Sequence, residues 1–189
     1  MTIKPTEEGG PIDTPIPSYD AVRELVELAS RAPSVHNTQP WRWCWDVNRL
    51  NLYADRSRHL SAADPDARDL LLSCGAALHH LTVAAAAHGW KSRIRRMPTV
   101  LEEDHLATVT FEQYDATDDD RTVLDALRAR RTDRRRPSSW PVPLERLEPM
   151  VDLAARAGAL ALPVTTERGR ARLLELTLEA TEIQRNDPG

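Results

Sequence analysis

A long apolar stretch between residues 64 and 88 constrains the fold of this chain more than any other feature. Asp64-Pro65-Asp66 is a typical helix start, and Gly89 is a typical helix end. Between them a helix would be apolar on nearly every side, through Leu70, Leu71, Leu72, Ala76, Leu78, Leu81 and Val83. Such a helix cannot face water, so we expect a long central helix that is buried among the other elements.

Shorter elements are expected on both sides of this helix. A first amphipathic helix begins at the N-cap Ser18 and ends before Pro33. Its apolar stripe has helical spacing and consists of Val22, Leu25, Val26 and Ala29. Strands are predicted at 41–45 and 50–54, paired around a turn at 47–49, and at 91–97, 107–113 and 162–166. Further helices are predicted at 121–130, where Asp118–Asp120 cap the start, and at 144–157 and 167–185.

Helices outnumber strands in this pattern, and the two do not alternate regularly. This order indicates the α+β class rather than a doubly wound α/β fold. We therefore expect a mixed central sheet that is flanked by helices.

The composition argues against several classes of partner. A chain of 189 residues with 41% hydrophobic content is long enough for one good core. Its net charge of −4 gives no reason to expect nucleic acid as a partner. The longest apolar run, at 81–87, is too short to cross a bilayer, so no membrane association is expected.

Two further features indicate a cytoplasmic protein. Residues 1–17 are polar and rich in proline, so we expect a flexible tail without the apolar segment of a secretory signal. Cys44 and Cys74 are thirty residues apart, and we interpret them as free thiols in a reducing compartment.

Two helical segments of the chain match each other. LVELASRA at 25–32 corresponds to MVDLAARA at 150–157 after a shift of 125 residues. Two alanine-rich amphipathic helices can match in this way by chance, and the alternative is a repeated unit. On the second interpretation, residues 18–120 form a first unit and residues 121–189 begin a second unit that is incomplete at Gly189. The apolar stripes of the second unit would then lack partners, so self-association is expected.

The loop at 31–41 carries the strongest functional signal. It reads Arg31-Ala-Pro-Ser-Val-His-Asn-Thr-Gln-Pro-Trp41 and places a set of polar residues between two prolines, after a helix and before a tryptophan-rich strand. A loop that is rich in donors and acceptors and stiffened at both ends suits the polar edge of a small-molecule ligand. The alternative is an ordinary connection between a helix and a strand.

Six arginines within nine residues form a second signal: Arg128, Arg130, Arg131, Arg134, Arg135 and Arg136. Three interpretations compete, namely a solvated helix end, a nucleic-acid site and a site for a small phosphorylated ligand. Nearby aspartates dilute the positive charge and no aromatic residues interleave, which argues against nucleic acid. A guanidinium holds a phosphate through two parallel hydrogen bonds, which favours the phosphorylated ligand.

The segments APSVHNTQPWRW at 32–43 and DPDARDLLLSCGAAL at 64–78 carry a family resemblance. The chain resembles the FMN-dependent nitroreductase superfamily, in particular its Acg-type branch, in which one chain holds two nitroreductase-like units. The resemblance extends more loosely over residues 18–189. It implies a nitroreductase-like, pseudo-dimeric α+β fold that binds FMN non-covalently, with NAD(P)H as the co-substrate to be tested.

The resemblance also assigns residues to the flavin site. Family members hold the flavin with an R-R-S-x-R-like motif and with the APS loop, and Arg130-Arg131-Thr132-Asp133-Arg134 is similar to the first motif, with Thr in place of Ser. It therefore assigns the phosphate and the polar edge of FMN to Arg130, Thr132 and Arg134. It assigns the loop side of the site to Pro33, Ser34, Val35, Asn37 and Gln39. Each motif occurs once, which implies one flavin site per pseudo-dimer.

The activity implied by the resemblance is an oxidoreductase reaction. Reduced nicotinamide would pass a hydride to FMN, which then reduces a nitro or quinone-type acceptor, and no side chain of this chain is assigned a catalytic role. The alternative is a protein that sequesters or stores FMN without nicotinamide-dependent turnover. His79, His80 and His88 have no acidic or thiolate residue at matching spacing, so packing or capping is expected for them and no metal site.

Overall fold

The structure is a computed structural model, and it describes residues 15–133, 135, 140 and 142–186. The chain consists of two compact units, residues 1–132 and residues 133–189, which are called the first and the second unit from here on. Each unit is described by itself. The sequence-based assignment of 121–189 to a second, repeated unit stays a prediction.

The first unit begins with helix α1 (Tyr19–Ala29), as predicted. The Ser18 hydroxyl accepts a hydrogen bond of 3.2 Å from the backbone N–H of Ala21, which caps the first turn. The four residues of the predicted stripe are fully buried: Val22, Leu25, Val26 and Ala29. The apolar spacing of this helix therefore identified its packed face.

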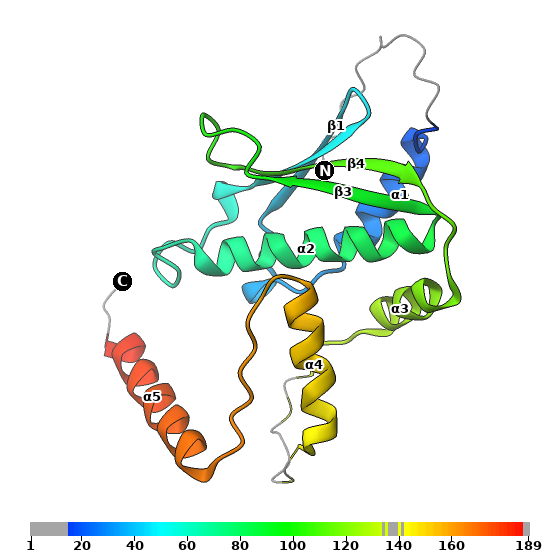
Figure 1. Cartoon of the computed structure of the whole chain (residues 1–189). Helices are drawn as coiled ribbons and strands as arrows, with labels where there is room; N and C mark the ends of the chain where they lie inside the picture. Colours follow the sequence, from blue (N-terminus) through cyan, green and yellow to red (C-terminus); the bar gives the residue numbers. More distant parts are fainter. Residues whose placement is uncertain (1–14, 134, 136–139, 141, 187–189) are drawn as a thin grey trace. The chain divides into compact units, whose positions relative to one another are not determined.

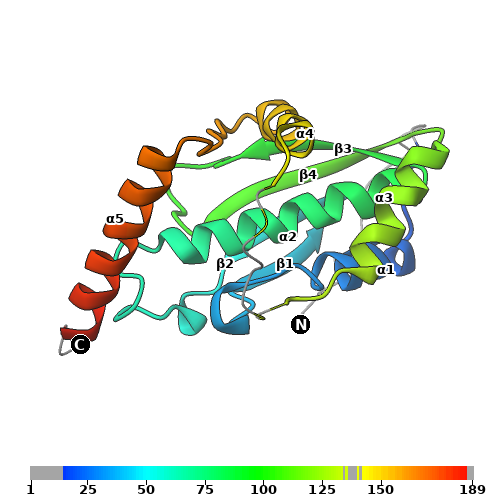
Figure 2. The same ribbon diagram turned by 90° about the horizontal axis from the view of Figure 1, so that it is seen from below.

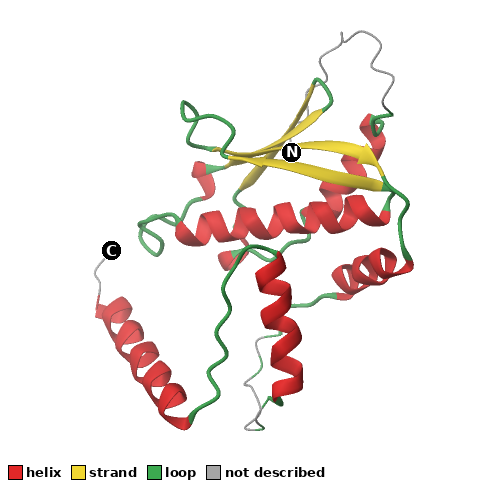
Figure 3. Ribbon diagram, viewed as in Figure 1, coloured by secondary structure: helices red, strands yellow, loops and turns green. Residues whose placement is uncertain are grey.

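Four antiparallel strands form one sheet, shown in yellow in Figure 3, with the order β1-β2-β4-β3. Their bounds are β1 (Trp41–Asp46), β2 (Arg49–Ala54), β3 (Trp90–Arg96) and β4 (His105–Gln113). Val47 and Asn48 join β1 to β2 with positive φ angles of 42° and 63°, the conformation of a tight hairpin turn. The α+β class is confirmed, and the described pairings are antiparallel rather than of both kinds.

Helix α2 (Arg68–Ala87) lies along one face of the sheet in both views of Figures 1 and 2. It contacts the sheet, α1 and α3 (Asp118–Ala129). Its buried side chains join those of α1 and of the inner face of the sheet in a single core. The long central helix is therefore confirmed, and Gly89 (φ 81°) follows its C-terminal end as predicted.

The prediction that this helix is buried on nearly every side was wrong in part. Leu71 and Leu72 are 46% and 71% exposed, because the sheet and the neighbouring helices of the first unit contact only one side of α2. By length and composition alone α2 could also cross a membrane, but one such helix is weak evidence, since the core helix of a soluble protein passes the same test. The expectation of a cytoplasmic protein without a membrane partner stays a prediction.

Two corrections concern the remaining elements. Helix α3 is capped by Thr117, not by the aspartates alone: the Thr117 hydroxyl accepts from the backbone N–H of Asp120, and the Asp120 carboxylate accepts from the N–H of Thr117. The second unit holds helices α4 (Leu144–Arg156) and α5 (Glu167–Asn186), as predicted. Residues 162–166 do not form the predicted strand, since no other strand lies in the described part of that unit to pair with them.

Candidate functional site

The polar loop between α1 and β1 has a strained backbone. His36, Asn37 and Gln39 all have positive φ angles, of 51°, 57° and 48°. Residues other than glycine rarely adopt this conformation, and each instance costs roughly 1 kcal/mol or more unless the surroundings enforce it. Backbone strain of this kind collects at functional sites, which makes the loop a candidate site, although Val47, Asn48, Ala67 and Met97 outside it also have positive φ angles.

Hydrogen bonds inside the loop fix this conformation. Residues Val35–Asn37 form a short 3-10 helix, and the backbone N–H of Asn37 donates to the carbonyl of Ser34 at 3.0 Å. The Ser34 hydroxyl accepts from the backbone N–H of Gln39 at 2.9 Å. Ser34 thus turns its hydroxyl into the loop, whereas Pro33, Val35 and Asn37 are exposed.

Neighbouring elements also hold the loop in place. From α2, the Ser73 hydroxyl accepts from the backbone N–H of Val35 at 3.2 Å and donates to the carbonyl of Asp69 at 2.7 Å. From the other side, the Arg58 guanidinium donates to the carbonyls of Thr38 and Gln39 at 3.3 and 3.4 Å. These contacts join the loop rigidly to α2 and to the 3-10 helix η2 (Arg56–Arg58).

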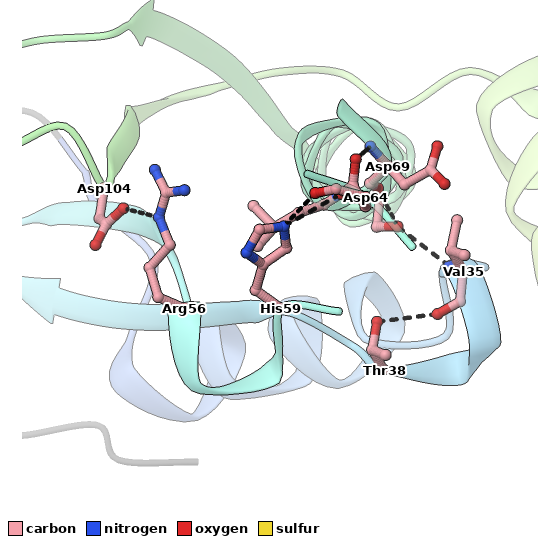
Figure 4. A network of polar contacts seen from close by, with 9 residues as sticks. Val35, Thr38, Arg56, His59, Asp64, Asp69 and Asp104 are labelled. Carbon is pink, nitrogen blue, oxygen red and sulfur yellow. Dashed lines mark hydrogen bonds and ion pairs between the residues drawn. The ribbon is translucent and has the colours of Figure 1, made fainter. Parts of the chain in front are cut away.

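Asp64 fixes the end of α2 that lies beside the loop (Figure 4). Its buried carboxylate accepts hydrogen bonds from the backbone N–H groups of Asp69 at 3.1 Å and Leu70 at 3.0 Å. His59 contacts the same residue, with 2.7 Å between its Nε2 and the Asp64 carbonyl and 3.6 Å to the carboxylate. Burial alone would raise the pKa of Asp64, but the backbone N–H groups hold this pKa below its ordinary value of 3.8.

The arginine motif begins where α3 ends, and it reaches the loop. The Arg130 Nη2 donates to the carbonyl of Arg31 at 2.8 Å, and the Arg31 Nη2 donates to the carbonyl of Arg128 at 2.9 Å. The Arg130 Nη1 lies 3.4 Å from the hydroxyl of Thr132. The fold thus brings two segments about a hundred residues apart into direct contact within the first unit.

The Arg130 side chain is partly buried and has no anionic partner among the described residues. A guanidinium has five N–H donors, and the buried Nε of Arg130 has no hydrogen-bond partner in the described structure. No carboxylate forms an ion pair with Arg130 within the described residues. Beside it, burial and the charge of Arg130 lower the pKa of His80 to about 4, so this imidazole is neutral near pH 7. A partly buried cation without an anionic partner suits a ligand that carries negative charge.

The structure brings some of the predicted site residues together and not others. Arg130 and Thr132 lie together, next to the residue that precedes Ala32 and Pro33. The loop residues Ser34, Val35, Asn37 and Gln39 make no hydrogen bond with Arg130 in the described structure, and Arg134 lies outside the described residues. Hollows of about 770 and 580 Å³ open beside the sheet strands, and none of the predicted residues line them.

Sequence reasoning did not single out the residues that support this site. Arg31 stands at the first position of the polar segment, and Ser73 belongs to the LLLSCG stretch of the central helix. A polar residue inside an otherwise apolar helix was the available signal for Ser73. Within the described residues no group of three or more His, Cys, Asp or Glu side chains is placed to hold a metal ion.

The chain is similar in sequence to curated proteins of Mycobacterium tuberculosis. It is 40% identical over 169 residues to "Putative NAD(P)H nitroreductase Rv3131", a match that covers 89% of this chain and 49% of that protein. It is 37% identical over 155 residues to "Putative NAD(P)H nitroreductase acg", with 82% of this chain and 46% of that protein covered. The chain thus spans about half the length of the curated relatives it matches.

Other comparisons add less. No protein-family model matches the chain. A solved structure of a nitroreductase-like protein from Streptococcus mutans has a TM-score of 0.46 and 16% sequence identity, over 56% of this chain and 83% of that one. This TM-score is too low to add to the sequence relation.

Proposed function

Because the chain belongs to the nitroreductase family, in the branch that includes the mycobacterial Acg protein, we propose that it provides the FMN site of an NAD(P)H-dependent oxidoreductase. The proposed electron acceptors are nitro and quinone-type compounds. Since the chain spans about half the length of these relatives, the activity of the whole protein is part of the proposal.

One observation carries the proposal: the Arg130 guanidinium contacts the residue that begins the polar loop. In the family resemblance the arginine motif and this loop hold the same flavin. Their direct contact in the first unit supports a shared site, although they are distant in the sequence.

The residues present fit the phosphate of FMN. Arg130 forms no ion pair with a carboxylate among the described residues, so a phosphate would meet an unneutralised guanidinium. The Thr132 hydroxyl beside it adds a second donor, and Arg134 is proposed as a third contact. On the loop side, Pro33 and Val35 expose apolar surface for the flavin ring, while the exposed Asn37 amide and the half-buried Gln39 amide can meet its polar edge.

The division of labour follows from these contacts. FMN, when bound, supplies the two-electron transfer between NAD(P)H and the acceptor, and the chain supplies binding and orientation. The rigid attachment of the loop to Ser73 and Arg58 keeps the orienting surface fixed.

Titration of the protein with FMN tests the binding proposal. Arg130→Ala removes one charge-assisted phosphate contact, so we expect a loss of about 2 kcal/mol, or about thirtyfold in Kd. Arg23→Ala is the matched control, because Arg23 is an exposed arginine on α1 with only a weak pair, 3.9 Å from Asp20. Unchanged FMN affinity in Arg130→Ala would show that the motif is assigned wrongly.

Reduction of the bound flavin tests the oxidoreductase proposal. NADPH is added anaerobically to the FMN-loaded protein, and the yellow flavin absorbance is followed. Loss of the absorbance is the expected result. Tight FMN binding without any loss of flavin absorbance would contradict the oxidoreductase proposal and favour an FMN-sequestering protein.

A further inference from the structure

Arg31 and the end of α3 exchange two hydrogen bonds in opposite directions. The side chain of Arg31 donates to the carbonyl of Arg128, and the side chain of Arg130 donates to the carbonyl of Arg31. Each bond joins a guanidinium to a backbone oxygen, at 2.9 and 2.8 Å. We call this pair of bonds the arginine clamp.

The end of a helix explains why arginines collect there. The last carbonyls of α3 lack partners within the helix and carry the negative end of its dipole, so they attract cations. The carbonyl of Arg128 accepts from Arg31 and also from the Arg131 Nη1, at 3.1 Å. The Arg131 Nη1 donates as well to the carbonyl of Arg130, at 2.8 Å. Arg130 and Arg131 therefore fold around the helix end, and Arg31 is the part of this arrangement that comes from the loop.

The clamp fixes the path of the chain on both sides of the Arg130 guanidinium. One bond holds the residue two positions before Arg130, and the other holds Arg130 itself. Without the Arg31 side chain, Arg130 would keep its bond to the Arg31 carbonyl but lose the anchor on Arg128. Its guanidinium would then sample more orientations, and a phosphate contact depends on that orientation.

Like charge adds to the effect. Arg31, Arg130 and Arg131 gather at one point, and within the described residues the nearby ion pair is that of Arg128 with Asp125, at 3.6 Å. Clustered cations raise the local positive potential and attract an anion more strongly than one guanidinium does.

We propose that Arg31 is a positioning residue for the phosphate of the flavin, acting through the arginine clamp and without touching the flavin ring. This inference rests on the proposed function, because it concerns the same FMN site. It adds a selectivity: Arg31 supports binding of FMN, which has a phosphate, and contributes nothing to binding of riboflavin, which has none.

The test compares the two flavins in the same protein. Dissociation constants for FMN and for riboflavin are measured by quenching of flavin fluorescence in the wild-type chain, Arg31→Ala, Arg31→Lys and the control Arg23→Ala. Arg31→Ala should weaken FMN binding about fivefold, which is the net contribution of one ordinary hydrogen bond, and leave riboflavin binding unchanged. Arg31→Lys keeps a cationic donor and should stay within about twofold of the wild type.

Each other outcome has a definite meaning. Equal weakening of FMN and riboflavin, or no weakening of either, overturns the positioning role, since Arg31 would then act on the loop in general or not at all. If the wild-type protein binds FMN no better than riboflavin, the assignment of the phosphate site is wrong. This result would count against the proposed function, whereas the first two outcomes count only against the role of the clamp. If Arg31→Ala does not fold, Arg31→Gln replaces it in the same comparison, because it keeps most of the side-chain length and removes the charge.

Discussion

Replacement of Asp64 tests how the structure holds the helix end beside the loop. Asp64→Ala removes two hydrogen bonds that the backbone N–H groups of Asp69 and Leu70 make with a buried carboxylate. A side-chain cap of this kind contributes about 1–2 kcal/mol, and a negative charge at a helix N-terminus adds about 0.5 kcal/mol. We therefore expect the variant to lose about 2 kcal/mol of stability at pH 7.

Urea unfolding measures this loss. Tryptophan fluorescence reports on the first unit, since Trp41 and Trp43 are buried in β1. Asp66→Ala is the matched control, because Asp66 is an exposed carboxylate in the same turn. The midpoint should fall for Asp64→Ala and stay unchanged for the control.

The dependence on pH gives the same prediction a second check. The pKa of Asp64 is lower in the folded state than its ordinary value of 3.8. A carboxyl with a depressed pKa contributes stability above its unfolded pKa and loses that contribution as the pH falls through the folded value. The difference between wild type and Asp64→Ala should thus be complete at pH 7 and shrink below about pH 4. Equal stability at pH 7, or a difference that persists undiminished in acid, would refute the capping role.

Three further predictions concern the rest of the chain. Alkylation should modify Cys44 in the folded protein and reach Cys74 only after unfolding, because burial raises the pKa of the Cys74 thiol to about 12. A time course of alkylation at each cysteine, followed by mass spectrometry, checks this order. Ser73→Ala should leave the N–H of Val35 without its acceptor and cost about 1 kcal/mol, with faster amide exchange at Val35 than in the wild type. The chain should self-associate through the apolar stripes of α4 and α5, so a stable monomer in light scattering would contradict this expectation.

The local elements of the fold could be predicted from the sequence because their causes are local. The Ser18 cap and the four-residue stripe of α1 depend on spacing within one turn or two, and the structure confirms them. The exposure of Leu72 could not be read in the same way, since spacing does not reveal which sides of a helix have neighbours. The predicted strand at 162–166 was wrong for a related reason. A strand needs a second strand to pair with, and the sequence of a short apolar segment does not show whether one is present.

The candidate site was predictable as two motifs but not as one arrangement. The loop and the arginine motif each have a recognisable composition, so both could be located. Their contact depends on how α3 returns to the end of α1, and a bond from a guanidinium to a carbonyl leaves no trace in the sequence of either segment. For the same reason Arg31 was passed over in favour of the residues that follow it.

The left-handed residues of the polar loop have a consequence for the kinetics of ligand capture. His36, Asn37 and Gln39 hold unfavourable backbone angles, and hydrogen bonds from neighbouring elements enforce the shape of their loop. The hydrogen bonds that Ser73 and Arg58 form with the loop when the first unit folds therefore offset the strain energy of these backbone angles. At the proposed site a ligand would therefore have little of the loop left to order, and preorganisation of this kind favours a single rapid association step over binding followed by a slow rearrangement.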